Sequence, residues 1–74
     1  MYRLREMRED LDLHQSDIAK VLNVSQVAYS YYELGKRQLP IDVLIKLASF
    51  YNVSADYILG LTNERKPYPK PKSW

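Results

Sequence analysis

The sequence contains no cysteine and only one histidine, His14. Without cysteine the chain can form neither a disulfide framework nor a thiolate metal site, and one histidine cannot hold zinc without further ligands. We therefore expect no metal and no cofactor. With no paired-carboxylate site in a cleft either, we expect no enzymatic activity and no small-molecule ligand. The lack of disulfides suits the cytoplasm, where we expect the protein to reside.

Long apolar runs are also missing. No segment approaches the roughly 20 apolar residues that span a bilayer. The first ten residues, MYRLREMRED, are charged throughout, which does not fit a signal peptide. We expect no membrane contact. At 74 residues and 46% hydrophobic, the chain supports one small domain with a modest core.

An excess of positive charge is absent from most of the chain. Residues 1–61 carry seven basic and eight acidic side chains, a balance of −1, whereas residues 62–74 carry four basic and one acidic, a balance of +3. The case for nucleic-acid binding therefore depends on where the cations lie. We predict a domain over residues 1–62. Residues 63–74 alternate prolines with lysines, which predicts an extended, disordered, basic tail.

Residues 15–37 contain two short helical patterns joined by a few residues, as in a helix-turn-helix. In the first, Ile18, Ala19 and Leu22 share one face. His14 stands at the N-cap position, and Leu13 with Ile18 occupies the positions of a hydrophobic staple, a pair of apolar residues that flanks the start of a helix.

The second pattern begins after Ser25, a strong N-cap residue. Val24 and Tyr29 form its staple, and Gly35 predicts its end. Apolar residues at helical spacing point inward, whereas a second set is left for solvent or a ligand: Gln26, Val27, Ser30 and Tyr31.

Three further helices complete the prediction. Residues 2–11 form the first, with Leu4, Met7 and Leu11 inward and Asp12 at its end. Residues 41–51 form the fourth, ended by Asn52. Ser54 caps the fifth, which Gly60 ends. Five short helices with short connections predict a compact all-α domain.

These residues resemble the phage-repressor/Cro-like helix-turn-helix family, often called XRE-type. The resemblance extends from Leu4 to about Thr62 and includes the ending VSADYILGLT. Asp12 stands where the family usually has glycine, and His14 where it usually has Ser or Thr. The matching positions are Leu4, Met7, Arg8, Leu13, Gln15, Ile18, Ala19, Leu22, Val24, Ser25, Tyr29, Tyr32, Glu33, Gly35, Lys36 and Pro40.

The resemblance implies a lambda-repressor-like domain whose third helix, from Ser25 to about Leu34, enters the DNA major groove. It implies that Gln26, Val27 and Tyr31 touch base edges. Gln15 would contact a phosphate from the start of the second helix, where the helix dipole attracts anions. Arg8 and Glu33 would form a structural salt bridge between the first and third helices.

The chemistry of these side chains fits such a surface. A glutamine amide pairs bidentately with adenine, and valine methyls pack on the thymine methyl. The Tyr31 hydroxyl could bond a base or a phosphate, or the ring could pack at a domain edge. Lys36 and Arg37 are expected to clamp phosphates. Ser25 and Ser30 are predicted to contact phosphates as well.

With so few cations on the body, one copy is expected to bind DNA weakly. We predict a homodimer on a palindromic operator, with Tyr57, Ile58, Leu59 and Leu61 as its candidate surface. The predicted function is a sequence-specific double-stranded DNA-binding regulator, most simply a repressor. The alternative is a protein-interaction module of the same fold, docking a partner through the third helix or the tail with little DNA affinity.

Overall fold

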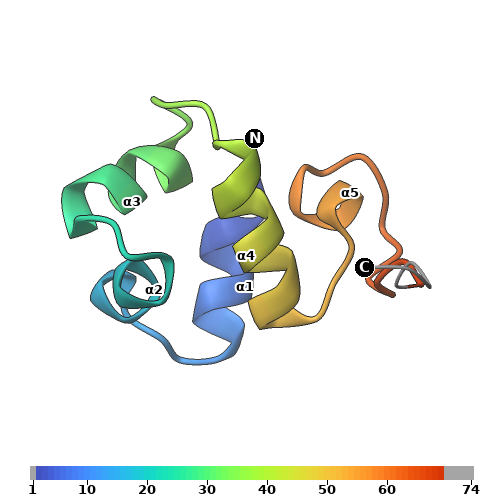
Figure 1. The fold of residues 1–74 in the computed structure, drawn as a ribbon. Coiled ribbons are helices and arrows are strands. Elements are labelled where there is room, and N and C mark those ends of the chain that lie inside the picture. The colour runs from blue at the N-terminus through green and yellow to red at the C-terminus, as the bar shows by residue number, and fades with distance from the viewer. Residues whose placement is uncertain (1, 70–74) are drawn as a thin grey trace.

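The structure is a computed structural model that describes residues 2–69. These residues form five α-helices: α1 (Leu4–Asp10), α2 (Gln15–Leu22), α3 (Gln26–Leu34), α4 (Ile41–Tyr51) and α5 (Ala55–Ile58). The predicted all-α, five-helix architecture is confirmed. In Figure 1, α3 and α5 lie at opposite ends of the molecule, with α4 between them. Within the described chain, no helix is both long and apolar enough to cross a membrane.

One apolar core holds the five helices together. α2 packs on α3 and α4 packs on α5, while α1 contacts α3. Tyr29 is fully buried despite its size, and its neighbour along the same face of α3, Tyr32, is buried with it. The buried apolar residues come from every helix and from one connection: Leu4, Met7, Ile18, Ala19, Leu22, Tyr29, Tyr32, Val43, Leu47, Val53, Tyr57 and Ile58.

Three of the connections share one pattern, which occupies residues 12–14, 23–25 and 52–54. The first residue of each, Asp12, Asn23 or Asn52, has a positive φ between 55° and 57°. The second is apolar, donates its backbone N–H to a carbonyl in the preceding helix at 3.0–3.1 Å and packs against or within the core. The third is the N-cap of the next helix. Asp and Asn tolerate this left-handed geometry better than most residues.

The N-caps satisfy backbone N–H groups that the helix itself leaves without partners. Each Ser25 and Ser54 side-chain oxygen accepts the N–H three residues ahead at 3.1 Å. At the start of α2 the backbone of the N-cap residue is the donor instead: the His14 N–H donates to the Asp17 carboxylate at 2.8 Å. The predicted starts of α2, α3 and α5 are therefore confirmed. Gly35, with φ of 73°, ends α3 as predicted.

The first helix is shorter than predicted, and one of its inward residues is wrong. α1 ends at Asp10, so Leu11 belongs to the turn and 56% of its surface is exposed. The chain reverses at Asp12, and Leu13 packs against the core instead. The prediction placed Leu11 inward because it assumed that the helix continued through residue 11.

The segment after α5 is not helical, as its prolines predicted, but its first part is attached to the domain rather than disordered. The backbone N–H of Ser54 donates to the Arg65 carbonyl at 3.1 Å, and its hydroxyl donates to the Glu64 carbonyl at 3.2 Å. Further along, the Tyr68 hydroxyl bonds the Asp56 carboxylate. The prediction for residues 70–74 lies outside the described residues.

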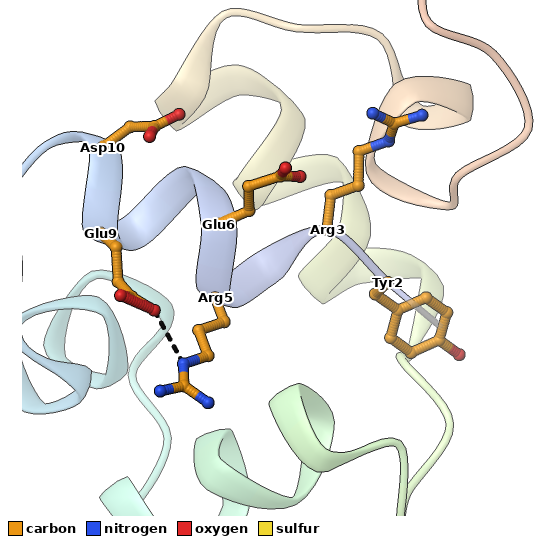
Figure 2. A pocket seen from close by; sticks show the side chains of 6 residues that line it. All are labelled: Tyr2, Arg3, Arg5, Glu6, Glu9 and Asp10. Carbon is orange, nitrogen blue, oxygen red and sulfur yellow. Dashed lines mark hydrogen bonds and ion pairs between the residues drawn. The ribbon is translucent and has the colours of Figure 1, made fainter.

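The residues before α1 tie distant parts of the chain together. Arg3 donates from its guanidinium to the Thr62 carbonyl at 3.0 Å, and the same group lies 4.4 Å from the centre of the Tyr57 ring. Tyr2 accepts the Leu39 N–H through its hydroxyl oxygen at 3.3 Å. Figure 2 shows these two side chains diverging from the start of α1, with the exposed Arg5–Glu9 ion pair further along the helix.

We expect Ser54→Ala to lower the free energy of unfolding by about 1–3 kcal/mol, measured by urea denaturation. The buried Ser54 hydroxyl both caps α5 and holds the segment that follows, so alanine leaves the Tyr57 N–H and the Glu64 carbonyl without their partner. The control is Ser49→Ala on the exposed face of α4, which is expected to change stability by less than about 0.5 kcal/mol. Equal effects of the two variants would contradict this account.

Candidate nucleic-acid interface

The exposed face of α3 forms one wall of a shallow hollow. Gln26, Val27, Ser30 and Tyr31 line it, together with Gln15 from the first turn of α2. Val27 has 62% of its surface exposed although it is apolar, and Tyr31 has 37%. The structure thus brings together on one surface the three predicted base-reading residues and two of the predicted phosphate-contacting residues.

This orientation of α3 follows from the residues on its other side. Tyr29 and Tyr32 are buried in the core, which fixes the rotation of the helix about its own axis. Ser25 begins the helix at a defined residue, because its side-chain oxygen accepts the Ala28 N–H. Ser25 itself is exposed, so its hydroxyl hydrogen remains available to an acceptor outside the domain.

Arg8 and Glu33 form the predicted salt bridge between α1 and α3. The Nε–Oε2 distance is 2.6 Å, and the two side chains are 14% and 4% exposed. A second bond joins Arg8 Nη2 to Glu33 Oε1 at 3.2 Å, which makes the pair bidentate. Arg8 also donates to the Leu13 carbonyl at 2.8 Å, so the pair fixes the turn that leads into α2.

Gln15 joins this network. Its amide Nε2 donates to Glu33 Oε1 at 3.2 Å, which leaves the amide oxygen and a second N–H for other partners. Burial by itself would raise the pKa of Glu33, but the hydrogen bonds from Arg8 and Gln15 outweigh it and hold the pKa below its ordinary value of 4.5. The same contact with Glu33 raises the pKa of Arg8. Both groups are therefore charged at neutral pH.

The family model described as helix-turn-helix matches residues 4–58, about three quarters of the chain. The chain belongs to the phage-repressor/Cro-like helix-turn-helix family. No solved structure matches it significantly.

Several curated proteins of this family are similar to the chain. An uncharacterised HTH-type transcriptional regulator, YobD of Bacillus subtilis, is 37% identical over 96% of this chain and 63% of its own length. The HTH-type transcriptional regulator ImmR of the same organism is 41% identical over 78% of this chain and 46% of its own. The cryptic phage CTXphi transcriptional repressor RstR of Vibrio cholerae is 33% identical over 69% and 46%. The chain thus spans about half to two thirds of the length of these relatives.

Two cations lie just beyond α3 of this helix-turn-helix domain. Lys36 and Arg37 are both exposed, and the ion pairs of the described residues, Arg5–Glu9 and Arg8–Glu33, include neither of them. The Arg37 guanidinium lies over the Tyr31 ring, 5.5 Å from its centre. Because Tyr31 also lines the hollow, one unpaired positive charge stands at its edge.

The predicted dimer surface is wrong in two of its four residues. Tyr57 and Ile58 belong to the core, with 8% and 0% of their surface exposed, so they are unavailable to a second copy. They are needed inside because α5 has only four residues and must use its apolar side to pack on α4. Leu59 is half-buried and Leu61 is 73% exposed, so these two remain accessible.

Two contacts of the interface were not foreseen from the sequence: the bond from Gln15 to Glu33 and the packing of Arg37 on Tyr31. The first joins residues 18 positions apart. The second crosses the end of a helix, so neither helical periodicity nor capping rules indicate it. The resemblance to the family predicted the pair Arg8 and Glu33 and placed Gln15 at the start of the second helix. Taken together, these two expectations could have suggested a contact between Gln15 and Glu33.

Glu33→Gln should lower the free energy of unfolding at pH 7 by about 3–5 kcal/mol, because it removes one charge of a buried ion pair and leaves Arg8 uncompensated. The pKa of Glu33 is lower in the folded chain than its ordinary value of 4.5. Its contribution is therefore fully present above about pH 4.5 and is lost as the pH falls through the folded pKa. Urea denaturation across this acid range measures both effects, and the variant should lose less stability on acidification than the unaltered protein.

Glu9→Gln is the matched control. Glu9 also pairs with an arginine, Arg5, at 2.7 Å, but the two side chains are 54% and 76% exposed. Figure 2 shows this ion pair on α1. Such surface pairs contribute about 0–1 kcal/mol. Similar losses from the two substitutions would show that burial of the Arg8–Glu33 pair adds nothing to its effect.

Proposed function

We propose that this protein is a sequence-specific double-stranded DNA-binding transcriptional regulator, most simply a repressor, that places α3 in the major groove. The observation that carries the proposal is the hollow in which Gln15 of α2 meets Gln26, Val27, Ser30 and Tyr31 of α3. The curated relatives support it, since their names describe transcriptional regulators and, for RstR, a repressor.

Base reading is assigned first to the start of α3. Gln26 is exposed at the first helical position, where its amide can pair bidentately with adenine. Val27 offers exposed methyl groups to a thymine methyl. A surface valine has little to gain from water, so its exposure beside Gln26 favours a partner with an apolar group. Together the two residues favour half-sites that contain A·T pairs.

Phosphate contacts surround this reading surface. The second N–H of the Gln15 amide lies at the start of α2, where the helix dipole adds to its attraction for an anion. Ser25 and Ser30 offer hydroxyl groups, and Lys36 and Arg37 offer charge at the far end of α3. The basic residues 65 and 66 follow α5, at the opposite end of the molecule from α3 in Figure 1, so a single domain does not bring them to the same groove.

Two copies are proposed to bind one operator. Few cations flank α3, and affinity for DNA depends chiefly on neutralised phosphates. A two-fold dimer doubles the contacts and matches a palindromic site with half-sites about 34 Å apart. Leu61, with Leu59 beside it, is the part of the predicted dimer surface that remains exposed.

Selection of bound fragments from random DNA, followed by a salt titration of the selected duplex, tests the proposal. We expect enrichment of a palindrome and an affinity that falls steeply with salt. Within that duplex, Gln26→Ala should cost about 1–3 kcal/mol and relax the preference at one base pair of each half-site. Lys36→Ala is the matched comparison, because loss of a phosphate contact weakens binding to all sequences about equally.

Recovery of no enriched sequence, or an affinity for the selected duplex that does not change with salt, would contradict the proposed function. A loss of affinity on Gln26→Ala that is the same for selected and random duplexes would contradict the assigned role of Gln26 alone.

Sedimentation of the protein on the selected duplex should give a mass of two protomers per operator. Leu61→Asp is expected to shift this to one protomer at the same concentration, because it places a charge in the apolar contact between copies. The control is Leu11→Asp, the same substitution at an exposed leucine directly after α1, and it should leave the dimer intact. A single protomer on a palindromic site with the unaltered protein would refute the dimer.

A further inference from the structure

The packing of Arg37 on Tyr31 gives these two residues a joint role. The guanidinium carbon lies 5.5 Å from the ring centre, within the range of a cation–π contact. Tyr31 belongs to α3 and lines the hollow, whereas Arg37 lies beyond the end of the helix. The contact therefore holds the Arg37 cation next to the hollow on α3, a position that the sequence alone did not predict.

The backbone around Gly35 explains why Arg37 returns over this ring. Gly35 has φ of 73°, a left-handed conformation that turns the chain back along the helix. The Lys36 N–H then donates to the Tyr31 carbonyl at 3.0 Å, which fastens the turn to the same residue. At the other end of the connection, the Tyr2 hydroxyl accepts the Leu39 N–H. Arg37 thus extends from a short segment held at both ends.

We propose that Tyr31 is a positioning residue for Arg37: its ring holds the guanidinium at the edge of the hollow, ready for a phosphate, and its hydroxyl reads no base. This inference rests on the proposed function. A guanidinium stacks through its planar face and keeps its N–H donors at the edge of that plane. The contact with Tyr31 restricts the Arg37 side chain to fewer conformations, while the N–H donors at the edge of the guanidinium can bind two phosphate oxygens.

The two roles of Tyr31 make different predictions. If the hydroxyl reads a base, Tyr31→Phe loses affinity for the selected site and little for random DNA. If the ring positions Arg37, Tyr31→Phe retains the contact, whereas Tyr31→Leu loses it and weakens binding to both duplexes. Only the second role alters the dependence on salt, because only that role concerns a phosphate contact.

The test is a double-mutant cycle that combines Tyr31→Leu with Arg37→Ala, measured on the selected duplex and on a short random-sequence duplex over a range of salt. We expect Tyr31→Leu to weaken binding about two- to fivefold on both duplexes. The slope of affinity against salt should fall by up to about one per bound protomer. Arg37→Ala should cost less affinity in the Tyr31→Leu background than alone, and Tyr31→Phe should restore most of the affinity that leucine loses.

A control and a DNA-free measurement complete the design. Tyr68→Leu removes an exposed tyrosine from the segment after α5 and should leave affinity unchanged. In the free protein, the Arg37 side-chain protons should show an upfield ring-current shift by NMR. That shift should persist in Tyr31→Phe and vanish in Tyr31→Leu, while thermal unfolding reports whether each variant is folded.

Each contrary outcome has a distinct meaning. Additive losses in the cycle, or an unchanged salt slope in Tyr31→Leu, would overturn the positioning role while leaving the DNA-binding function in place. A loss in Tyr31→Phe confined to the selected duplex would establish base reading by the hydroxyl instead. Failure of the unaltered protein to bind either duplex at low salt would overturn the proposed function and, with it, this inference.

Discussion

The buried ion pair between Arg8 and Glu33 is the interaction on which the geometry of the domain depends. It joins α1 to α3, holds the carbonyl of Leu13 in the turn before α2, and receives the amide of Gln15 from α2 itself. Three helices therefore meet at one carboxylate. Two charges taken out of water require such complete hydrogen bonding, because an unpaired partner in that place would be strongly destabilising.

The placement of charge matters more for this protein than its total. The body of the chain is nearly neutral, yet two cations follow directly after α3, and neither is neutralised by a carboxylate among the described residues. Several acids lie instead on α1, where Glu6, Glu9 and Asp10 are exposed (Figure 2). A nearly neutral body attracts polyanions only weakly, so the two cations after α3 stand out as a local concentration of positive charge.

Local rules were enough to predict the helices and most of their ends. Ser25, Gly35, Asn52 and Ser54 act through backbone groups within a few positions, so their roles can be read from neighbouring residues. Contacts between distant residues could not be read in this way. The segment after α5 is held through the backbone carbonyls of Glu64 and Arg65, which every residue type possesses, so its composition predicted disorder. Tyr57 and Ile58 were predicted to contact a second copy because periodicity alone does not show how much surface of a four-residue helix is exposed. In the structure both side chains are buried.

The three matching connections, at residues 12–14, 23–25 and 52–54, limit how this chain can change over evolution. In each one the apolar middle residue is Leu13, Val24 or Val53. Its backbone N–H bonds a carbonyl of the preceding helix, and its side chain occupies the staple position before the next helix. One inserted residue would separate these two roles, because no single residue could then both bond the preceding helix and occupy the staple position of the next. One residue added inside α3 would instead rotate everything after it by about 100° around the helix axis. Substitutions on the exposed face of α3 therefore leave this framework in place, whereas changes of length are tolerated only outside these connections and helices.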